Sequence, residues 1–352
     1  MNIVHITYML TFGGIETMLV NIANEQARLG HRVDIIVVEN GATDERLTAL
    51  LDPGVRLHCA QRKAGRKDVM AVARINHFLL RARPDAIHIH SSGLMRCILI
   101  PRYRCITCVT LHDLPSPKNT VAIESVPRVF AISEAVQREL KEKYQVDSIV
   151  IPNGIHPERI KTRIAGGEHT GFRIVSVSRL EHEKKGQDIL IEALAELKRR
   201  GHEGVTLDFI GDGASKAYLE QLCKDCGVYS QVRFLGARAP EFIFAHLSDY
   251  DLFVQPSRHE GFALTVAEAM AARVPVLVSS GQGPEEVIGH GECGFIFRNG
   301  NAADCANRIE DIIDNEDIIS ILDRAYKRVL ALYNVKATAK CYLEQYLMRE
   351  QQ

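Results

Sequence analysis

The sequence predicts an α/β protein with two doubly wound parallel sheets, each in a domain of its own. Short apolar runs alternate with segments whose apolar residues recur at helical spacing, which is the pattern of repeated strand–helix–strand units. This alternation begins at the N-terminus and starts again at Arg173. The chain has 352 residues, which is enough for two domains that each bury a core.

We expect the first domain to cover residues 1–158. Its candidate strands are 3–7, 33–38, 86–90, 108–111 and 129–132, and its candidate helices are 16–29, 68–82 and 134–144. Strands that are joined through helices run parallel, with helices on both faces of the sheet. The polar, glycine-rich segment 161–170 follows and is the best candidate for a linker.

We expect the second domain to cover residues 159–334. Its candidate strands are 173–178, 205–210, 232–235, 252–254 and 274–278. Helices are predicted to begin near Gly186, Ala214, Pro240, Ala263 and Ala302. The last segment, 335–352, reads as a further helix without a strand to follow it.

The composition is that of an ordinary globular protein, with 25% charged and 46% hydrophobic residues. A formal net charge of −1 argues against a nucleic-acid partner. No apolar run approaches the roughly 18 to 20 residues that span a bilayer, and the N-terminus begins a strand instead of a signal peptide. We therefore expect a cytoplasmic protein.

Nine cysteines are scattered along the chain, an odd number for a secreted disulfide framework. Two Cys-x-x-Cys pairs, Cys105/Cys108 and Cys223/Cys226, fall in different predicted domains. Alternation along a strand also sends Cys105 and Cys108 to opposite faces. Since a structural zinc needs its ligands to converge, free thiols are the favoured interpretation.

The segment 258–271 holds the most informative pair of acidic residues. Glu260 lies in the loop after a buried strand, where open α/β sheets place their ligands. Glu268 lies about two turns into the following helix, whose side chains tilt back toward that loop. Carboxylates accept hydrogen bonds from sugar or ribose hydroxyls, and backbone N–H groups at a helix start attract phosphate. A solvated loop acid and an ordinary surface glutamate are the alternative interpretation.

The E-x7-E pattern of Glu260 and Glu268 resembles the signature of the retaining glycosyltransferases of family 4, which have the GT-B fold. The resemblance implies two Rossmann-like domains facing across a cleft, with the terminal helix crossing back to the first domain. It assigns the nucleotide-diphosphate sugar to the second domain and the acceptor to the first. Glu260 would contact the sugar hydroxyls and Glu268 the ribose. The donor site would also include Gly261, Phe262, Ala263, Leu264 and Thr265.

Arg179 and Lys185 follow the first strand of the second domain and resemble the family's diphosphate-binding pair. Two fixed cations stabilise the charge that develops on a departing diphosphate and can replace a metal ion. Lys184 is the alternative to Lys185, and a solvated charged loop is the alternative to both. No cofactor is implied.

Two further candidates lie in the first domain. Gly13 and Gly14 separate the first strand from the first helix and resemble the family's Gly-Gly-x-Glu motif, which contacts the donor phosphate and the acceptor. From the stretch alone, a tight turn is an equally good interpretation. His112 ends a strand where the family places a histidine beside the reacting sugar, to which it can donate a hydrogen bond. His90 is a weaker candidate of the same kind.

Three other motifs carry less information. Asp249-Tyr-Asp251 matches the D-x-D metal motif of a different class, but leads into a buried strand, so we interpret it as structural. Gly211-Asp-Gly213 follows a strand but lacks the third glycine of a dinucleotide fingerprint. The loop 279–287 resembles the family's glycine-rich donor loop, although Gln282 stands where a glycine is expected.

The predicted function is that of a retaining, metal-independent glycosyltransferase. It would move a sugar from a nucleotide-diphosphate sugar to a glycan, a lipid-linked or a small-molecule acceptor, in polysaccharide or glycolipid biosynthesis. The alternatives are a sugar-nucleotide epimerase of the same fold and an inactive nucleotide-sugar-binding protein. The basic residues Arg62, Lys63, Arg66 and Lys67 allow a peripheral contact with the inner face of the membrane, although a solvated loop is the simpler interpretation.

Overall fold

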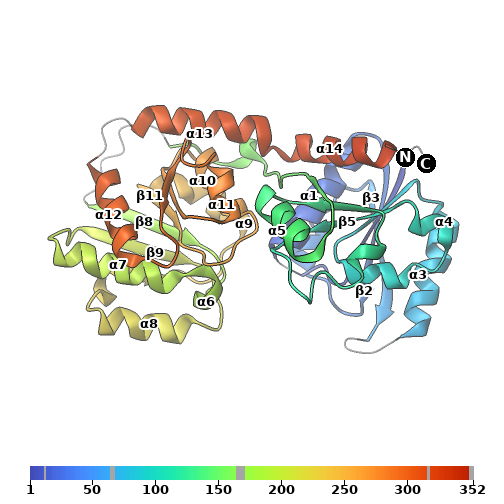
Figure 1. The fold of residues 1–352 in the computed structure, drawn as a ribbon, viewed down its shortest axis with the longest axis horizontal. Coiled ribbons are helices and arrows are strands. Elements are labelled where there is room, and N and C mark those ends of the chain that lie inside the picture. Colours follow the sequence, from blue (N-terminus) through green and yellow to red (C-terminus); the bar gives the residue numbers. More distant parts are fainter. Residues whose placement is uncertain (12, 64–67, 164–170, 315–317, 349–352) are drawn as a thin grey trace. The chain divides into compact units, whose positions relative to one another are not determined.

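A computed structural model describes residues 1–11, 13–63, 68–163, 171–314 and 318–348 (Figure 1). The chain divides into two compact units, and each is described by itself. Unit 1 is Met1–Gly154 together with Val335–Gln352, and unit 2 is Ile155–Asn334. The chain passes from unit 1 to unit 2 after Gly154 and returns to unit 1 after Asn334. The helix α14 (Val335–Leu347) therefore belongs to unit 1.

Unit 1 is built on a seven-stranded sheet in the order β3-β2-β1-β4-β5-β6-β7, and every neighbouring pair is parallel. The order reverses between β1 and β4, which is where a doubly wound sheet opens a crevice for ligands. The strands are β1 (Asn2–Thr7), β2 (Arg32–Glu39), β3 (Val55–Arg62), β4 (Ala86–Ile89), β5 (Thr107–Leu111), β6 (Arg128–Ala131) and β7 (Ile149–Val150).

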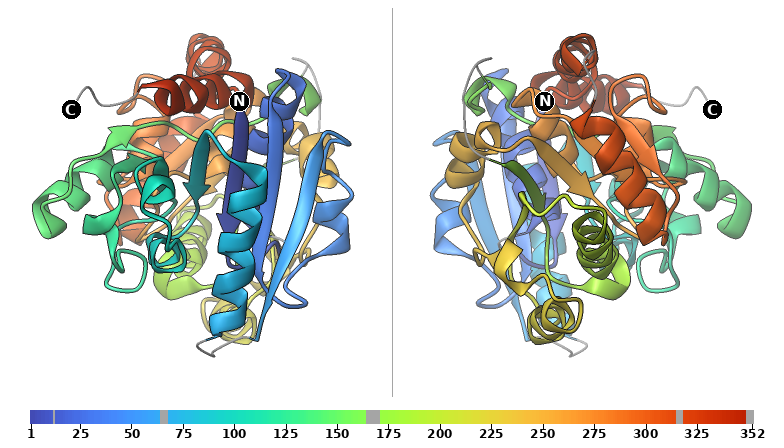
Figure 2. Two further views of the ribbon diagram at one scale, coloured as in Figure 1. Left: turned by 90° about the vertical axis from the view of Figure 1, so that its right-hand side faces the viewer. Right: turned by 90° about the vertical axis from the view of Figure 1, so that its left-hand side faces the viewer.

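Helices lie on both faces of the unit 1 sheet, as Figure 2 shows for α3, which stands in front of the strands in the left-hand view. On the other face α14 packs beside α1. The described helices of four or more α-helical residues are α1 (Gly14–Arg28), α2 (Glu45–Thr48), α3 (Val69–Ala82), α4 (Pro101–Arg104), α5 (Glu134–Tyr144) and α14. Side-chain oxygens of Asp44, Asp68 and Ser133 cap α2, α3 and α5.

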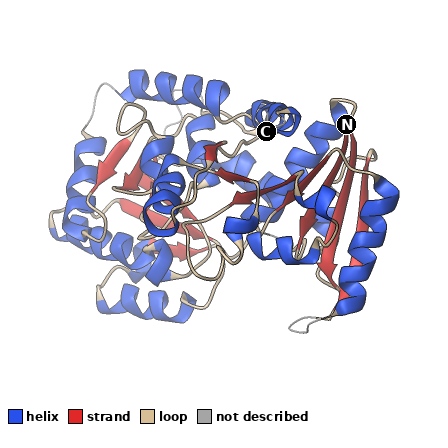
Figure 3. Ribbon diagram, turned by 45° about the vertical axis from the view of Figure 1, so that its right-hand side comes forward, coloured by secondary structure: helices blue, strands red, loops and turns tan. Residues whose placement is uncertain are grey.

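Unit 2 has a six-stranded parallel sheet in the order β10-β9-β8-β11-β12-β13, again with helices on both faces (Figure 3). Its strands are β8 (Phe172–Val177), β9 (Val205–Ile210), β10 (Val232–Phe234), β11 (Leu252–Gln255), β12 (Val276–Ser279) and β13 (Phe295–Phe297). Its helices are α6 (His182–Lys185), α7 (Gln187–Arg199), α8 (Lys216–Asp225), α9 (Pro240–His246), α10 (Leu264–Ala271), α11 (Gly283–Val287), α12 (Ala302–Ile313) and α13 (Ile318–Leu332).

The core of unit 2 explains why its central strands read as continuous apolar runs. β8 and β11 are adjacent and covered on both faces, so nearly all their side chains are buried. Apolar side chains of α7 and α12 complete this core, including Leu190 and Ile309, which are fully buried. The small residues of α10 are also buried, so this helix can lie close to the strands.

The predicted fold class is confirmed, while several single elements differ from prediction. The strands β3, β7 and β13 and the helix α13 were not predicted from the sequence. The units separate between Gly154 and Ile155. The predicted linker begins later, and its part after residue 163 lies outside the described residues. Before it, the Lys161 amide donates to the Phe244 carbonyl, so this stretch is fastened to unit 2.

None of the described helices combines the length and the apolar character needed to cross a membrane.

Candidate functional site

The first predicted donor-site residue, Arg179, lies exposed just beyond β8 at the carboxyl end of the unit 2 sheet. Two glycines after β9 pack closely against the loop that carries Arg179. A Cβ on Gly211 would lie 1.9 Å from the Ser178 carbonyl oxygen, and one on Gly213 would lie 2.4 Å from that of Leu180. Larger residues would push the Arg179 loop away, so both glycines of the Gly-Asp-Gly motif are needed for this close packing.

The next loop enters α7 through Gly186, which has a left-handed backbone with a φ of +67°. A Cβ at this position would lie 2.0 Å from the Pro256 carbonyl oxygen, so the loop after β8 passes directly against the loop after β11. Arg258 joins the same two loops. Its guanidinium binds both carboxylate oxygens of Asp188, at 2.7 and 2.8 Å, and donates to the His182 carbonyl.

Lys185 and Glu260 meet across these loops. The Lys185 Nζ lies 2.5 Å from the Glu260 Oε2, and the two side chains are 18% and 14% exposed. Because water screens this pair so little, the Coulomb attraction between its charges is stronger than in an exposed ion pair. The structure thus brings together two residues that the sequence places 75 positions apart.

The loop from Glu260 to Thr265 is fixed by its backbone. The Glu260 N–H donates to the Gln282 side-chain oxygen at 3.1 Å, and a Cβ on Gly283 would lie 2.1 Å from the Gly261 carbonyl oxygen. Phe262 is buried against the Tyr333 ring. Ala263 has a left-handed backbone with a φ of +68°, unusual for alanine, and directly precedes Leu264, where α10 begins. Backbone strain of this kind is commonly found at binding loops.

Glu268 lies in the second turn of α10 and is part-buried. Desolvation raises the pKa of its carboxyl group from 4.5 to about 7. Within the described residues the carboxylate makes no hydrogen bond or ion pair with another side chain. A desolvated acid of this kind can bind the hydroxyl groups of a ligand, whose hydrogen bonds would replace the water that it has lost.

In unit 1, Gly13 and Gly14 form the turn from β1 into α1. Gly13 has an extended backbone. Apart from the adjacent residues and the backbone of α1 itself, no atom of the described residues lies within 4 Å of a Cβ added to Gly14. The surroundings of Gly14 are open, so a ligand could approach the backbone at the start of this fifteen-residue helix.

His112 follows β5 and lies in a row of histidines. Its Nε2 is 2.9 Å from the Nδ1 of His90, whose Nε2 is 3.1 Å from the Nδ1 of His5. Burial lowers the pKa of His112 to about 4, so the ring is neutral at pH 7. Its Nδ1 has no hydrogen-bond partner among the residues that the structure describes.

The two aspartates of the Asp249-Tyr-Asp251 motif bond to neighbouring groups of unit 2. Asp251 accepts hydrogen bonds from the Arg163 guanidinium at 2.7 Å and the Arg173 amide at 2.8 Å, which fastens the start of β11 to β8. Asp249 pairs with His246. The nine cysteines are free thiols.

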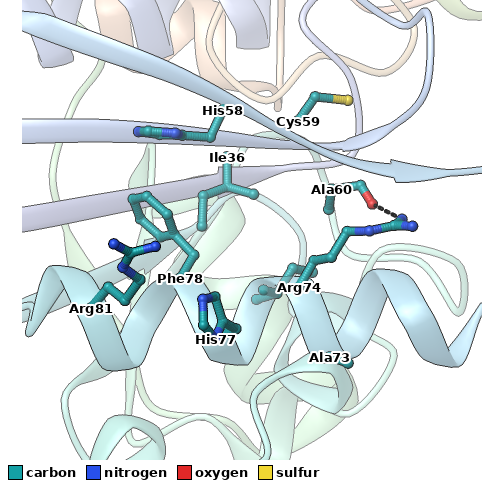
Figure 4. A pocket seen from close by; sticks show the side chains of 10 residues that line it. Ile36, His58, Cys59, Ala60, Ala73, Arg74, His77, Phe78 and Arg81 are labelled. Carbon is teal, nitrogen blue, oxygen red and sulfur yellow. Dashed lines mark hydrogen bonds between the residues drawn. The ribbon is translucent and has the colours of Figure 1, made fainter.

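A separate pocket of about 490 Å³ lies between β3 and α3 of unit 1 (Figure 4). Arg74, His77 and Arg81 of α3 line it together with His58 and Cys59 of β3, and Arg74 donates to the Ala60 carbonyl at 2.9 Å. None of the predicted site residues lines this pocket. Of the predicted basic loop, Arg62 pairs with Glu39, while Arg66 and Lys67 lie outside the described residues.

Comparison with known proteins gives two family matches that follow one another along the chain. Residues 12–159 match the model described as Glycosyltransferase Family 4, and residues 158–328 match that of Glycosyl transferases group 1. The chain belongs to this glycosyltransferase family. The E-x7-E segment, Arg179 and Lys185 fall within the group 1 match, and Gly13, Gly14 and His112 fall within the family 4 match.

Relatives of this glycosyltransferase are found among curated proteins and solved structures. The chain spans less than half the length of the curated relatives that it matches at 32% identity. One is the lipopolysaccharide core biosynthesis glycosyltransferase LpsE of Rhizobium meliloti, where the match covers 46% of each chain. The D-inositol 3-phosphate glycosyltransferase of Corynebacterium aurimucosum is 26% identical over 86% of this chain and 83% of its own. The structure of Anabaena HepE with UDP and glucose is 25% identical, with a TM-score of 0.81 over 98% of this chain and 99% of HepE.

Several residues that support the candidate site were not identified from the sequence. Arg258 and Asp188 join the two loops that carry Glu260 and Lys185, and Gln282 orients the Glu260 backbone. The position of Arg258, two residues before Glu260, could have marked it as a candidate. Its partner Asp188 on α7 could not be predicted from sequence spacing.

Proposed function

We propose that this glycosyltransferase is a retaining, metal-independent enzyme that transfers a sugar from a nucleotide-diphosphate sugar. The observation that carries the proposal is the shielded pair of Lys185 and Glu260, with Arg179 exposed on the same pair of loops. A phosphate-binding cation and a hydroxyl-binding carboxylate side by side suit a ligand that has both groups.

In this proposal Arg179 and Lys185 bind the diphosphate. As the glycosidic bond breaks, negative charge grows on the leaving phosphate, and fixed cations stabilise that charge in the transition state. N–H groups at the start of α10 add a partial positive charge. No metal is needed for this role, because two side-chain cations already meet the developing charge.

The two glutamates have different tasks in the same site. Glu268 accepts hydrogen bonds from the ribose, since its carboxyl group has no competing partner within the described residues. Glu260 starts bound to Lys185 and contacts hydroxyls of the sugar when Lys185 turns to the phosphate. The Gly14 turn and His112 supply hydrogen-bonding groups of unit 1, which we assign to the acceptor and the transferred sugar.

The acceptor class is proposed from the relatives. LpsE is named for lipopolysaccharide core biosynthesis, and another relative is a phosphatidylinositol monomannoside mannosyltransferase. The HepE structure contains UDP and glucose. We therefore propose a glycan or lipid-linked acceptor and a cytoplasmic location, with UDP- and GDP-sugars as the first donors to test.

Incubation with a panel of UDP- and GDP-sugars tests the proposal. Release of nucleoside diphosphate with a product of retained anomeric configuration, in the presence of a chelator, is the expected result. An inverted product or loss of activity with chelator would contradict the retaining or the metal-independent part. Epimerised donor, or binding without turnover, would instead support the alternatives.

A further inference from the structure

The buried histidines of unit 1 form a continuous row that the donor site does not account for. His5 lies on β1, and His90 and His112 directly follow β4 and β5, so adjacent parallel strands place the three rings in line. At its inner end the Nε2 of His5 lies 2.8 Å from the side-chain oxygen of Gln26 on α1. The side-chain nitrogen of Gln26 faces the hydroxyl of Tyr346 on α14 at 3.5 Å.

A metal site is the first alternative for such a cluster, because one nitrogen from each of His5, His88 and His90 lies within 4.8 Å of the others. Both nitrogens of His88 are already hydrogen-bonded, the Nδ1 to the Tyr346 hydroxyl at 2.6 Å and the Nε2 to the Thr110 hydroxyl at 2.7 Å. His88 therefore has no free lone pair to offer a metal. The two histidines that remain are fewer than the three protein ligands of a catalytic zinc site.

The direction of the hydrogen bonds follows from the side-chain amide of Gln26. Its oxygen can only accept, so the Nε2 of His5, 2.8 Å away, must carry a hydrogen. Its NH₂ group can only donate and faces the oxygen of Tyr346, so the hydroxyl hydrogen of Tyr346 is directed to the Nδ1 of His88.

The hydrogen positions on the other ring nitrogens of the row follow because the three imidazoles are neutral. A neutral imidazole has one N–H and one bare nitrogen. Burial lowers the pKa of His5 and of His112 to about 4 and that of His90 well below 6.5, so all three rings are neutral at pH 7. The bare Nδ1 of His5 accepts from the Nε2–H of His90, and the bare Nδ1 of His90 accepts from the Nε2–H of His112.

We propose that Tyr346 and Gln26 are positioning residues that act through His5 and His90 to hold His112 in its Nε2–H tautomer. His112 therefore presents the bare Nδ1 as a hydrogen-bond acceptor. That this nitrogen receives a hydroxyl of the sugar or the acceptor rests on the proposed function. In this proposal His112 accepts a hydrogen bond from the ligand, whereas the expectation from the sequence is that it donates one.

Tyr346→Phe removes only the hydroxyl that sets the direction, and Gln26→Met removes the amide that transmits it. In either variant the hydrogen bonds along His5, His90 and His112 can point in either direction. His112 then becomes a mixture of its two tautomers. Tyr342→Phe is the matched control. Tyr342 lies one turn earlier on α14, and its hydroxyl bonds to Thr110, which is linked to Tyr346 through His88, and not to Gln26, His5, His90 or His112.

Imidazole ¹⁵N shifts of the full-length, ¹⁵N-histidine-labelled protein distinguish the two tautomers, and His112→Gln assigns the signal. We expect the Nε2–H form of His112 in the wild type and in Tyr342→Phe, and a mixture in Tyr346→Phe and Gln26→Met. An Nδ1–H form in the wild type would overturn the proposal even if the variants fail to fold. A signal that neither Tyr346→Phe nor Gln26→Met changes would overturn their role.

Turnover is the second measurement. With a nucleotide sugar that the wild type uses, kcat should fall about tenfold in Tyr346→Phe, the effect of one misplaced hydrogen bond. Affinity for the bare nucleoside diphosphate and the kcat of Tyr342→Phe should be unchanged. The tautomer measurement needs no substrate, so a protein that uses no nucleotide sugar would contradict the proposed function and leave the histidine row intact.

Discussion

At the scale of single residues, Lys185 and Glu260 show how two charges of the candidate site balance each other. Each side chain is largely shielded from water, and each charge is balanced by the other at 2.5 Å. Under the proposed function, a diphosphate that binds Lys185 has to separate this pair. The cost is compensated only if the ligand supplies both an anion for Lys185 and hydroxyls for Glu260.

Removal of the lysine charge should therefore affect turnover strongly. In Lys185→Met and in Arg179→Ala we expect kcat to fall on the order of 10²-fold, because the charge developing on the phosphate loses a fixed cation. Steady-state kinetics with a donor sugar measures this. Lys184→Met is the matched control, and an equal loss there would assign the phosphate contact to Lys184 instead.

Above about pH 7, the ionised carboxylate of Glu268 should lower the free energy of unfolding, because its site is desolvated. Its folded-state pKa of about 7 exceeds the ordinary 4.5, so the folded state holds the proton more tightly and loses stability as the pH rises from 4.5 to 7. In Glu268→Gln we expect the free energy of unfolding to rise by up to about 3 kcal/mol at pH 8 and by little at pH 4.5.

Urea denaturation at the two pH values tests this, with Glu192→Gln on the exposed face of α7 as control. Nucleoside diphosphate affinity should fall in the same Glu268→Gln variant. A variant that gains no stability at pH 8, or that binds the nucleotide as well as the wild type, would disagree with the assigned role.

At the scale of elements, the start of α7 decides where Lys185 lies. Gly186 combines a left-handed backbone with a close approach to the Pro256 carbonyl. An alanine would adopt this backbone only with strain, and its Cβ would collide with the carbonyl oxygen. We expect Gly186→Ala to cost about 2 to 5 kcal/mol of stability, from backbone strain and crowding together.

Gly227→Ala separates these two effects. Gly227 has a φ of +70°, but its Cβ position has no atom of the described residues within 4 Å apart from its chain neighbours. It should cost only about 1 to 2 kcal/mol. Thermal unfolding measures both variants, and equal losses would show that the Pro256 contact has no weight.

The elements that could be predicted from sequence are those with a clear period. The helix expected at 134–144 is α5 with the same bounds, and the buried strands β1, β2, β8 and β9 stand within a residue or two of prediction. The edge strand β3 was missed because it mixes exposed polar residues such as Arg56 and Gln61 into its run. β13 is too short to show a period.

Some features of the candidate site could be predicted from the sequence, and others could not. Glu260, Glu268 and Arg179 could be selected because each lies beside a strand or helix that the sequence makes visible. The ion pair of Lys185 with Glu260 depends on how two loops pass each other, which no spacing within one segment encodes. The histidine row was invisible for the same reason, since it joins three strands and two helices.

At the scale of the whole molecule, the two units should respond to acid in opposite ways. In unit 1 the pKa values of His5, His88, His90 and His112 are lowered, so the unfolded state binds more protons and stability falls as the pH drops from 6.5 toward 4. In unit 2 the raised pKa of Glu268 adds stability over part of the same range.

Hydrogen exchange followed by peptide mapping at pH 7.5 and pH 5, corrected for intrinsic rates, should detect this difference. Peptides from β1 and β4 should lose protection at pH 5, while those from β8 and β11 keep it. Equal loss in both units would mean that charging the histidines is not what limits the acid stability of unit 1.

The return of α14 to unit 1 has a consequence for synthesis on the ribosome. Unit 2 is one uninterrupted stretch, Ile155–Asn334, whereas unit 1 needs segments that are made before that stretch and a segment made after it. A nascent chain halted before Val335 would hold every segment of unit 2 but would lack Tyr342 and Tyr346, which bury their rings against the early strands. The half that is translated first should therefore be the half that finishes folding last.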